Sequence, residues 1–423
     1  MKMRLALIAA VVLALVHAMS VPSTAQPLSP ERVLGAQMRL SANLAAEMAK
    51  QPRNDPNIVI SPASVAGVMA LIDIGADMKM RGAIWDTLGF KPALGHDAAS
   101  DLAALRATIT QAPEKQADDT KFDLANVVMF DPQAKPYDKA MKEMRATGAE
   151  VSTAPLSDVE NIRRINRWVA GKTQNLIPGI LAEQPLPPGL VAVNALYFKG
   201  LWPRSFSKDL TRPQTFHMVA GETQVPMMHA QERYNFKRDG DFAAIEMPYR
   251  GGRFAMVVLT NTARSLQLQD FAPVAGWLNG SGFTSREVSL SLPRFTLEAS
   301  EELLEPLKAL GLKHGMDSVT AFENLAMLPQ EISRIVQKTF MKVDEEGTEA
   351  AAATGVIMET ASLKPREPER LVVDRPFLFA LRDRESGLIL MSGYIARPAT
   401  GPAASLGEPK KFASETPNSP RKE

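Results

Sequence analysis

The side chains that most often carry catalysis or bind metals are scarce in this chain. It has five histidines and no cysteine. No two histidines have the His-x-x-x-His spacing of a helical metal site. Without cysteine there is no thiol nucleophile, no Cys-based metal site and no disulfide. The sequence also lacks a G-x-S-x-G elbow, a Walker A loop and a G-x-G-x-x-G turn. We therefore expect no catalytic site, no metal and no other cofactor.

Charge and composition narrow the class further. Lys and Arg number 48 against 47 Asp and Glu, which gives a formal net charge of +1. No basic block is long enough to indicate a nucleic-acid partner. Hydrophobic residues make up 45% and charged residues 22% of the chain, as is typical of a soluble globular protein. Since no disulfide can form, the apolar core must hold the fold together alone.

The N-terminus has the pattern of a secretory signal peptide. A basic start precedes an apolar run over residues 5–15, and Ser23 and Ala25 have the spacing of a small-residue cleavage site. The apolar run is too short to span a bilayer. We expect residues 1–25 to be removed and the mature protein to be secreted or periplasmic, with no membrane partner.

Hydrophobic periodicity predicts a mixed α+β fold. Helical spacing runs over residues 30–50 and 162–173, and another helix begins at Ser61-Pro62, where serine can cap and proline fits the first turn. Because no regular βαβ order is present, we expect one α+β domain over residues 26–398. The polar, Ala- and Pro-rich stretch 399–423 is predicted to be a disordered tail. The predicted strands are 190–199, 254–259, 288–292, 335–343, 377–382 and 388–396.

One long segment, residues 344–370, fits neither a helix nor a strand. Four consecutive alanines, which favour a helix, lie between Gly347 and Gly355, and a strand-forming Val-Ile-Met triplet follows. Pro365 and Pro368 then exclude both regular structures. An exposed loop of this length between two strands is usually functional or disordered. We therefore look for the protein's function in this loop.

The loop begins with ten residues that resemble the hinge of inhibitory serpins, a family of protease inhibitors. Further matches follow in the family's order along nearly the whole mature chain. Each match is weak alone, and their shared order makes the resemblance specific. The hinge residues are Glu345, Glu346, Gly347, Thr348, Glu349, Ala350, Ala351, Ala352, Ala353 and Thr354. The other matching segments are residues 57–64, 88–90, 165–169, 194–202, 292–295, 374–377 and 390–393.

The resemblance implies a secreted, inhibitory-type bacterial serpin with a large, mainly antiparallel central sheet. It also implies two smaller sheets, about eight or nine helices, and an exposed reactive loop over residues 345–370. In the family a protease cuts this loop and becomes acyl-bonded to it, and the hinge half then enters the large sheet as a strand. Before cleavage we expect Thr348 to lie near the exposed loop.

An inserted strand would bury one alternate set of side chains, which we expect to go under the helix that covers the sheet. All members of this set are neutral, whereas a charge there would be buried without a partner. A flexible linker, the alternative interpretation, has no reason to keep charges off one alternate set. The set comprises Thr348, Ala350, Ala352, Thr354, Val356, Met358 and Thr360.

The resemblance also implies a reactive bond and a supporting site. The family's spacing from the hinge glycine places the bond between Ala361 and Ser362, with Leu363 and Met358 as second and third choices because the loop is longer than usual. A small residue at the cleaved bond suits proteases of elastase-like or subtilisin-like preference. A polar cluster below the sheet opening is expected at Ser61, Ser64, Asn194 and Gln337.

Two residues of that polar cluster, Gln337 and Ser61, need a separate comment. The family commonly has histidine where this chain has Gln337. Glutamine can still donate and accept a hydrogen bond, but it does not respond to pH. Ser61 is also explained as the cap of the helix that follows it, and it can serve in both ways.

The sequence leaves two functions open. The first is suicide inhibition of serine proteases, with cysteine proteases as a second target class, by a monomer without a nucleic-acid partner. The second is a non-inhibitory serpin that acts as a binder, carrier or chaperone on the same fold. Non-inhibitory relatives often have bulky or charged inward hinge residues. This hinge has none, which favours inhibition.

Overall fold

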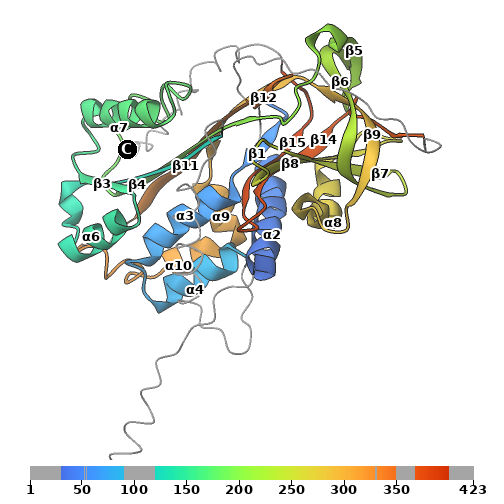
Figure 1. Ribbon diagram of the computed structural model, residues 1–423. Coiled ribbons are helices and arrows are strands. Elements are labelled where there is room, and N and C mark those ends of the chain that lie inside the picture. The colour runs from blue at the N-terminus through green and yellow to red at the C-terminus, as the bar shows by residue number, and fades with distance from the viewer. Residues whose placement is uncertain are drawn as a thin grey trace, which may run out of the picture.

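The computed structural model describes residues 30–51, 53, 55–89, 120–328, 331–348 and 367–399. In these residues the strands form two sheets, one of six strands and one of nine. Helices lie on both sides of the six-stranded sheet (Figure 1). On one side is α7 (Val159–Lys172), and on the other are α2 (Pro30–Ala49), α3 (Pro62–Asp73), α4 (Met78–Thr87), α9 (Leu304–Leu307) and α10 (Lys313–Met316).

The six-stranded sheet has two parallel pairings among otherwise antiparallel ones. β2 runs antiparallel to β4 and β10 runs antiparallel to β11, whereas β4 is parallel to β11 and β3 is parallel to β2. The strand order is β10 (Phe295–Glu302), β11 (Ile332–Val343), β12 (Gly347–Thr348), β4 (Leu190–Leu201), β2 (Lys121–Phe130) and β3 (Glu150–Thr153).

The nine-stranded sheet is held together by one long strand, β6 (Glu222–Asp239). Its first part pairs with β5 (Arg212–His217), its last part pairs with β7 (Phe242–Pro248), and β9 (Thr284–Pro293) runs along most of it. The two smaller sheets that we expected are therefore continuous through β6. The remaining strands are β1 (Ile58–Ile60), β8 (Phe254–Asn261), β13 (Glu369–Val372), β14 (Phe377–Asp383) and β15 (Ile389–Ile395).

Further helical segments complete the described structure. None of its helices combines the length and hydropathy that crossing a bilayer requires. The segments are α6 (Asp138–Ala146), α8 (Phe271–Val274), a π-helical turn over residues 308–312, and 3₁₀ turns over residues 132–134, 208–210, 268–270 and 275–279.

Helix α3 lies at the centre of the molecule, and its sequence explains both its start and its burial. The Ser61 side chain accepts a hydrogen bond from the Ser64 backbone N–H at 3.0 Å, and Pro62 occupies the first turn. Both features favour a helix start. Every residue of α3 is buried, in keeping with its predominantly apolar sequence.

The six-stranded sheet separates two apolar clusters, and β4 contributes to both because its side chains alternate between the two faces. The larger cluster lies on the side of α3 and extends to the nine-stranded sheet. The smaller cluster lies under α7. From β4, the larger cluster includes Leu190, Ala192, Leu196 and Phe198, and the smaller includes Val191, Val193 and Ala195.

Asn166 fastens α7 to the segment that leads from it toward β4. Its side-chain oxygen accepts hydrogen bonds from the backbone N–H groups of Ile180 and Leu181, each at 3.0 Å, and its amide donates to the Leu181 carbonyl at 2.9 Å. The side chain is buried. Since buried backbone groups need partners, Asn166 helps to hold this segment against α7.

The α+β class and the predicted helices and strands named above are confirmed, with bounds that differ by a few residues. Sequence periodicity missed several elements, among them β2, β3, β5, β6, β7, β10, α4 and α6. Ala399, the first residue of the predicted tail, forms a bridge with Thr296 beside β10. Residues 1–25 and 400–423 lie outside the described residues, so the signal peptide and the rest of the tail stay predictions.

We expect Asn166→Ala to lower the free energy of unfolding by about 2–4 kcal/mol, because it leaves two buried N–H groups without partners. Arg164→Ala, an exposed position on the same helix, is the matched control and should change stability little. Urea unfolding measures both variants. Equal stabilities of the two would show that Asn166 does not hold the segment after α7.

Candidate functional site

The parallel pair of β4 and β11 forms a seam at the centre of the six-stranded sheet. The register runs from Ile332 opposite Leu190 to Phe340 opposite Tyr197. Beyond that point the two strands are separated by β12, which is the start of the predicted hinge. β12 is antiparallel to both neighbours, with Thr348 opposite Gly200 on one side and Val343 on the other. The sheet thus already holds two hinge residues.

Thr348 is fully buried in this arrangement. Its hydroxyl forms a hydrogen bond of 2.7 Å with the hydroxyl of Tyr249, whose ring stacks on Trp202 with centroids 4.5 Å apart. Burial raises the pKa of Tyr249 and keeps its hydroxyl protonated. Our expectation that Thr348 lies near the exposed loop before cleavage is therefore wrong.

The direction of the Thr348 side chain corrects a second expectation. It faces Tyr249, which belongs to the larger apolar cluster, and not the smaller cluster under α7. The alternate set that begins at Thr348 would therefore enter the main core on insertion. Sequence reasoning assigned this set to the wrong face of the sheet, and its members beyond Thr348 lie outside the described residues.

Gly347 is required by a close approach of two backbones. A Cβ atom at this position would lie 2.2 Å from the Gly200 carbonyl oxygen and 2.7 Å from the Leu201 Cα. Gly200 has a similar role toward the site, because a Cβ there would meet the Tyr249 ring at 2.7 Å. Only glycine at both positions allows β12 and Tyr249 to lie as they do.

Three hydrogen bonds hold the hinge backbone just before β12. The Trp202 indole N–H donates to the Asp344 carbonyl at 3.1 Å, and the Trp202 backbone N–H donates to the Glu346 carbonyl at 2.9 Å. The Phe206 backbone N–H donates to the Glu345 carbonyl at 2.7 Å. Two residues after β4 therefore bind three consecutive carbonyls, of Asp344 and of the first two hinge residues.

Glu345 adds an ion pair that the sequence did not reveal. Its buried carboxylate is paired with Arg294 and accepts a hydrogen bond from the Thr211 hydroxyl at 2.7 Å. Burial alone would raise the pKa of Glu345, but the hydrogen bonds from Arg294 and Thr211 outweigh it and hold the pKa below its usual 4.5. The neighbouring ion pair of Glu346 with the exposed Lys208 contributes less to stability, because solvent screens it.

The predicted polar cluster lies halfway along the seam. Gln337 and Asn194 are register partners across it. The Gln337 side-chain oxygen accepts a hydrogen bond from the Ser61 backbone N–H at 2.9 Å, and the Ser61 hydroxyl donates to the Leu390 carbonyl at 2.5 Å. Ser61 therefore has both roles that the sequence suggested: its side chain caps α3, and its backbone N–H binds the seam residue Gln337.

Asn194 and Ser64 are less tightly connected. Asn194 donates its amide to Asn126, its register partner on β2, at 2.8 Å. The Asn194 side-chain oxygen and the Ser64 hydroxyl are buried without a hydrogen-bond partner among the described residues. Asn126 is the member that sequence reasoning missed. Polar groups left partly unsatisfied at a strand seam lower the cost of separating it.

The rest of the predicted loop lies outside the described residues. This applies to hinge residues from Glu349 onward and to the reactive-bond candidates Ala361, Ser362, Leu363 and Met358. Their assignments stay predictions. Within the described chain, no group of three or more His, Asp or Glu side chains is placed to hold a metal ion.

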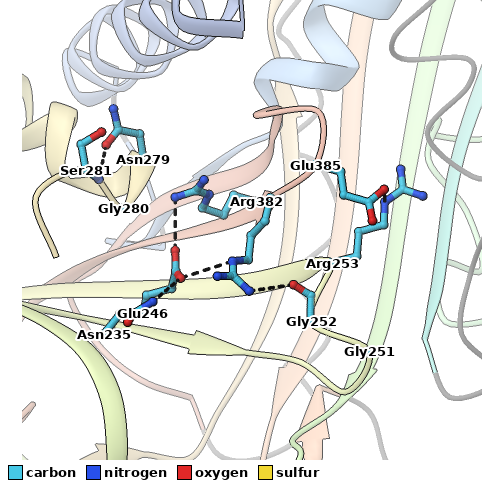
Figure 2. A pocket seen from close by; sticks show the side chains of 11 residues that line it. Asn235, Glu246, Gly251, Gly252, Arg253, Asn279, Gly280, Ser281, Arg382 and Glu385 are labelled. Carbon is cyan, nitrogen blue, oxygen red and sulfur yellow. Dashed lines mark hydrogen bonds and ion pairs between the residues drawn. The ribbon is translucent and has the colours of Figure 1, made fainter. Parts of the chain in front are cut away.

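A polar cavity of about 560 Å³ lies away from the hinge, between β7, β14 and residues 279–281 (Figure 2). Its charged side chains, three arginines and two glutamates, are paired with one another. Glu246, which is buried, pairs with Arg382 at 3.2 Å and with Arg384 at 3.4 Å, and Arg253 pairs with Glu385 at 3.6 Å (Figure 2). These pairs fix the ends of strands, and we assign the cavity no role at the hinge.

The fold and seam correspond to a known protein family. The family model for serpins, described as serine protease inhibitors, matches residues 35–398. Leukocyte elastase inhibitor of Bos taurus is 32% identical over 364 residues, which cover 81% of this chain and 93% of the relative. This chain therefore belongs to the serpin family, and it has the serpin fold that its sequence implied.

Solved structures agree on the fold. A thermophilic serpin, tengpin, in its native state has a TM-score of 0.75 at 21% identity and covers 88% of this chain and 96% of its own. Human thyroxine-binding globulin has a TM-score of 0.74 at 22% identity, over 87% and 99% of the two chains. The bacterial origin suggested by the resemblance stays a prediction.

We expect the contribution of Glu345 to stability to depend on pH. Its folded pKa lies below the ordinary value of 4.5, so the stabilisation is complete above that pH and is lost as pH falls through the folded pKa. The free energy of unfolding of the wild type minus that of Glu345→Gln should therefore be constant near neutrality and shrink in acid.

Urea titrations at a series of pH values measure this difference. Glu305→Gln is the matched control, because Glu305 pairs with Lys308 on the surface with a side chain 71% exposed. Its difference from the wild type should be small at every pH. If the difference in unfolding free energy between the wild type and Glu345→Gln stays unchanged well below pH 4.5, the lowered pKa of Glu345 is refuted.

Proposed function

We propose that this serpin is a secreted suicide inhibitor of serine proteases. In the proposed reaction the protease serine oxygen attacks the carbonyl carbon of the residue before the reactive bond. The peptide bond breaks, an acyl ester forms, and the new amino terminus of the next residue leaves. The hinge half of the loop then enters the seam between β4 and β11 and carries the protease with it before water hydrolyses the ester.

The observation that carries this proposal is the orientation of β12. It runs antiparallel to both β4 and β11, which are parallel to each other. A longer strand in the same position would replace one parallel ladder by two antiparallel ladders. Parallel pairing is slightly less stable per residue than antiparallel pairing, and each added ladder hydrogen bond contributes about 1 kcal/mol. Insertion is therefore favoured once cleavage frees the loop.

The residues after Thr348 suit that path. Ala350 and Ala352 are small and neutral, so they can pass into the core without an unpaired charge. An inserted strand of about 14 residues at ~3.3 Å each would carry the acyl end roughly 45 Å. That distance is comparable with the size of a domain, so the protease would be dragged from one end of the sheet to the other.

The choice of target rests on the reactive bond. Ala361 before Ser362 suits a shallow pocket. The similarity to a protein named leukocyte elastase inhibitor supports an elastase-like target, with subtilisin-like proteases as the next class to examine and cysteine proteases after them. The signal-like segment 1–25 supports export to the periplasm or the cell exterior.

The second candidate, a non-inhibitory binding protein, shares the fold, as the likeness to thyroxine-binding globulin shows. The experiment that separates the two incubates the full chain with elastase-like, subtilisin-like and papain-like proteases. We expect a complex that survives denaturing gels, a released fragment that begins at Ser362, and a higher melting temperature after cleavage. Cleavage without any complex and with an unchanged melting temperature would favour the binding protein.

We expect Thr348→Arg to change the protein from an inhibitor into a substrate. The guanidinium would replace a side chain that is fully buried against Tyr249, at a cost of several kcal/mol. β12 should therefore leave the sheet, while the rest of the fold persists. Slow insertion then lets the acyl ester hydrolyse, which gives cut serpin and active protease.

Thr348→Val is the matched control, because it keeps the shape and loses only the hydrogen bond to Tyr249. It should still form complexes. The number of serpin molecules consumed per protease molecule inhibited measures both variants. Unchanged stoichiometry for Thr348→Arg would refute strand insertion as the mechanism.

A further inference from the structure

An apolar cavity of about 350 Å³ is lined by Trp202 and Phe206, which bind the start of the hinge. It is enclosed by the segment after β4, by the middle of β6 and by the end of β7, and the β5–β6 hairpin and β12 lie at the same end of the molecule (Figure 1). This volume is within the range of small-molecule sites. The apolar walls are formed by Trp202, Pro203, Phe206, Tyr234, Met247 and Pro248.

The walls of this cavity are also the groups that hold the hinge. Trp202 and Phe206 donate the three hydrogen bonds to the carbonyls of Asp344, Glu345 and Glu346. The Trp202 ring also stacks on Tyr249, which bonds the buried hydroxyl of Thr348. Any molecule that packs against the two aromatic side chains therefore acts on the position of β12.

The rim of the cavity favours a negative charge. Arg204 and Arg233 line it against a single carboxylate, Glu232, which leaves an excess of one positive charge. Arg204 uses one nitrogen for its pair with Glu232 at 2.5 Å, and its side chain is 59% exposed, so other donors remain available.

Tyr234 lines the same cavity and carries a second donor. Burial raises the pKa of Tyr234, and its hydroxyl makes no hydrogen bond within the described residues. It therefore stays protonated near neutral pH and is free to donate to an anion. A donor and a cation beside an apolar cavity are the groups that orient an amphipathic anion.

We propose that this cavity is a regulatory site for a flat apolar molecule with one anionic group, and that its occupation stabilises the docked hinge. Occupation holds Trp202 and Phe206 in the positions from which they bind the hinge carbonyls. A ligand that binds only this arrangement shifts the equilibrium away from an undocked hinge by its differential affinity. The site goes beyond the proposed protease inhibition and needs no protease.

The first measurement is binding of 8-anilinonaphthalene-1-sulfonate, a fluorescent anionic arene, to the full uncleaved chain. We expect one site that is weakened at least about tenfold by Arg204→Glu, because the variant replaces the rim cation by a repelling charge. Arg212→Glu, an exposed position on β5 outside the cavity, is the matched control and should leave the dissociation constant unchanged. The neutral analogue N-phenyl-1-naphthylamine should bind both variants alike.

The second measurement is hydrogen exchange of the amides from Asp344 to Thr348 in the same samples. If opening of the hinge requires release of the ligand, a free ligand concentration ten times the dissociation constant slows this exchange by about tenfold. The slowing should be absent at the same ligand concentration in Arg204→Glu. Thermal melts of the ligand-free variants check that each is folded.

Each outcome decides the proposal. Equal binding to the wild type and to Arg204→Glu would place the arene elsewhere and overturn the site. Binding that depends on Arg204 but leaves hinge exchange unchanged would overturn the coupling. Because neither measurement uses a protease, a failure to form covalent complexes would refute only the proposed inhibition and would leave these results to stand.

Discussion

The parallel pairing of β4 with β11 is the constraint on which the rest of the structure depends. Both strands have antiparallel partners on their outer sides, β2 and β10, and they meet each other in the same direction. A strand that ran the other way between them would be antiparallel to both. The sheet is therefore closed between β4 and β11 by the less favourable kind of pairing, and this seam marks the place where one more strand fits. Under the proposed trapping mechanism, strand direction alone would favour insertion, with no need for strain at any one residue.

Other parts of the molecule control this seam from three directions. On the outer face, Asn166 helps to hold α7 and its following segment together. On the inner face, the N-terminus of α3 bonds Gln337 at the middle of the seam. At its end, Trp202 and Glu345 anchor the hinge where the strands part. The middle contact uses neutral groups, so its strength does not change with pH, whereas the Glu345 anchor weakens in acid. Closure of the seam therefore depends on neutral hydrogen bonds and docking of the hinge on an ion pair, so substitutions can change one without the other.

Sequence reasoning reached the α+β class and the start of α3 from local patterns such as Ser61-Pro62, whereas the hinge and the polar cluster came from the resemblance to serpins. The neutral alternation after Gly347 predicts a buried strand, and of that set the structure describes only Thr348. Sequence reasoning failed where a partner is remote in the chain. The docking of Thr348 depends on Tyr249, which lies 99 positions away, and no local pattern links the two. Strand β6 was missed for a different reason: both of its faces are only partly buried along much of its length, so its hydrophobic alternation is weak.

The docked hinge also decides which side chains an inserted strand would bury. A shift of one residue exchanges the two faces of a strand, and here it would send Glu349 into the core in place of neutral side chains. Two features forbid that shift. Only glycine fits against the Gly200 carbonyl, so Gly347 cannot move out of its position, and the Thr348 hydroxyl is matched to that of Tyr249. On insertion, Gly347 and Thr348 would thus set the register for the rest of the strand. Insertion would extend an existing ladder whose register is already set. It would therefore be faster than insertion from an undocked loop, and in the proposed mechanism it must precede hydrolysis of the acyl ester.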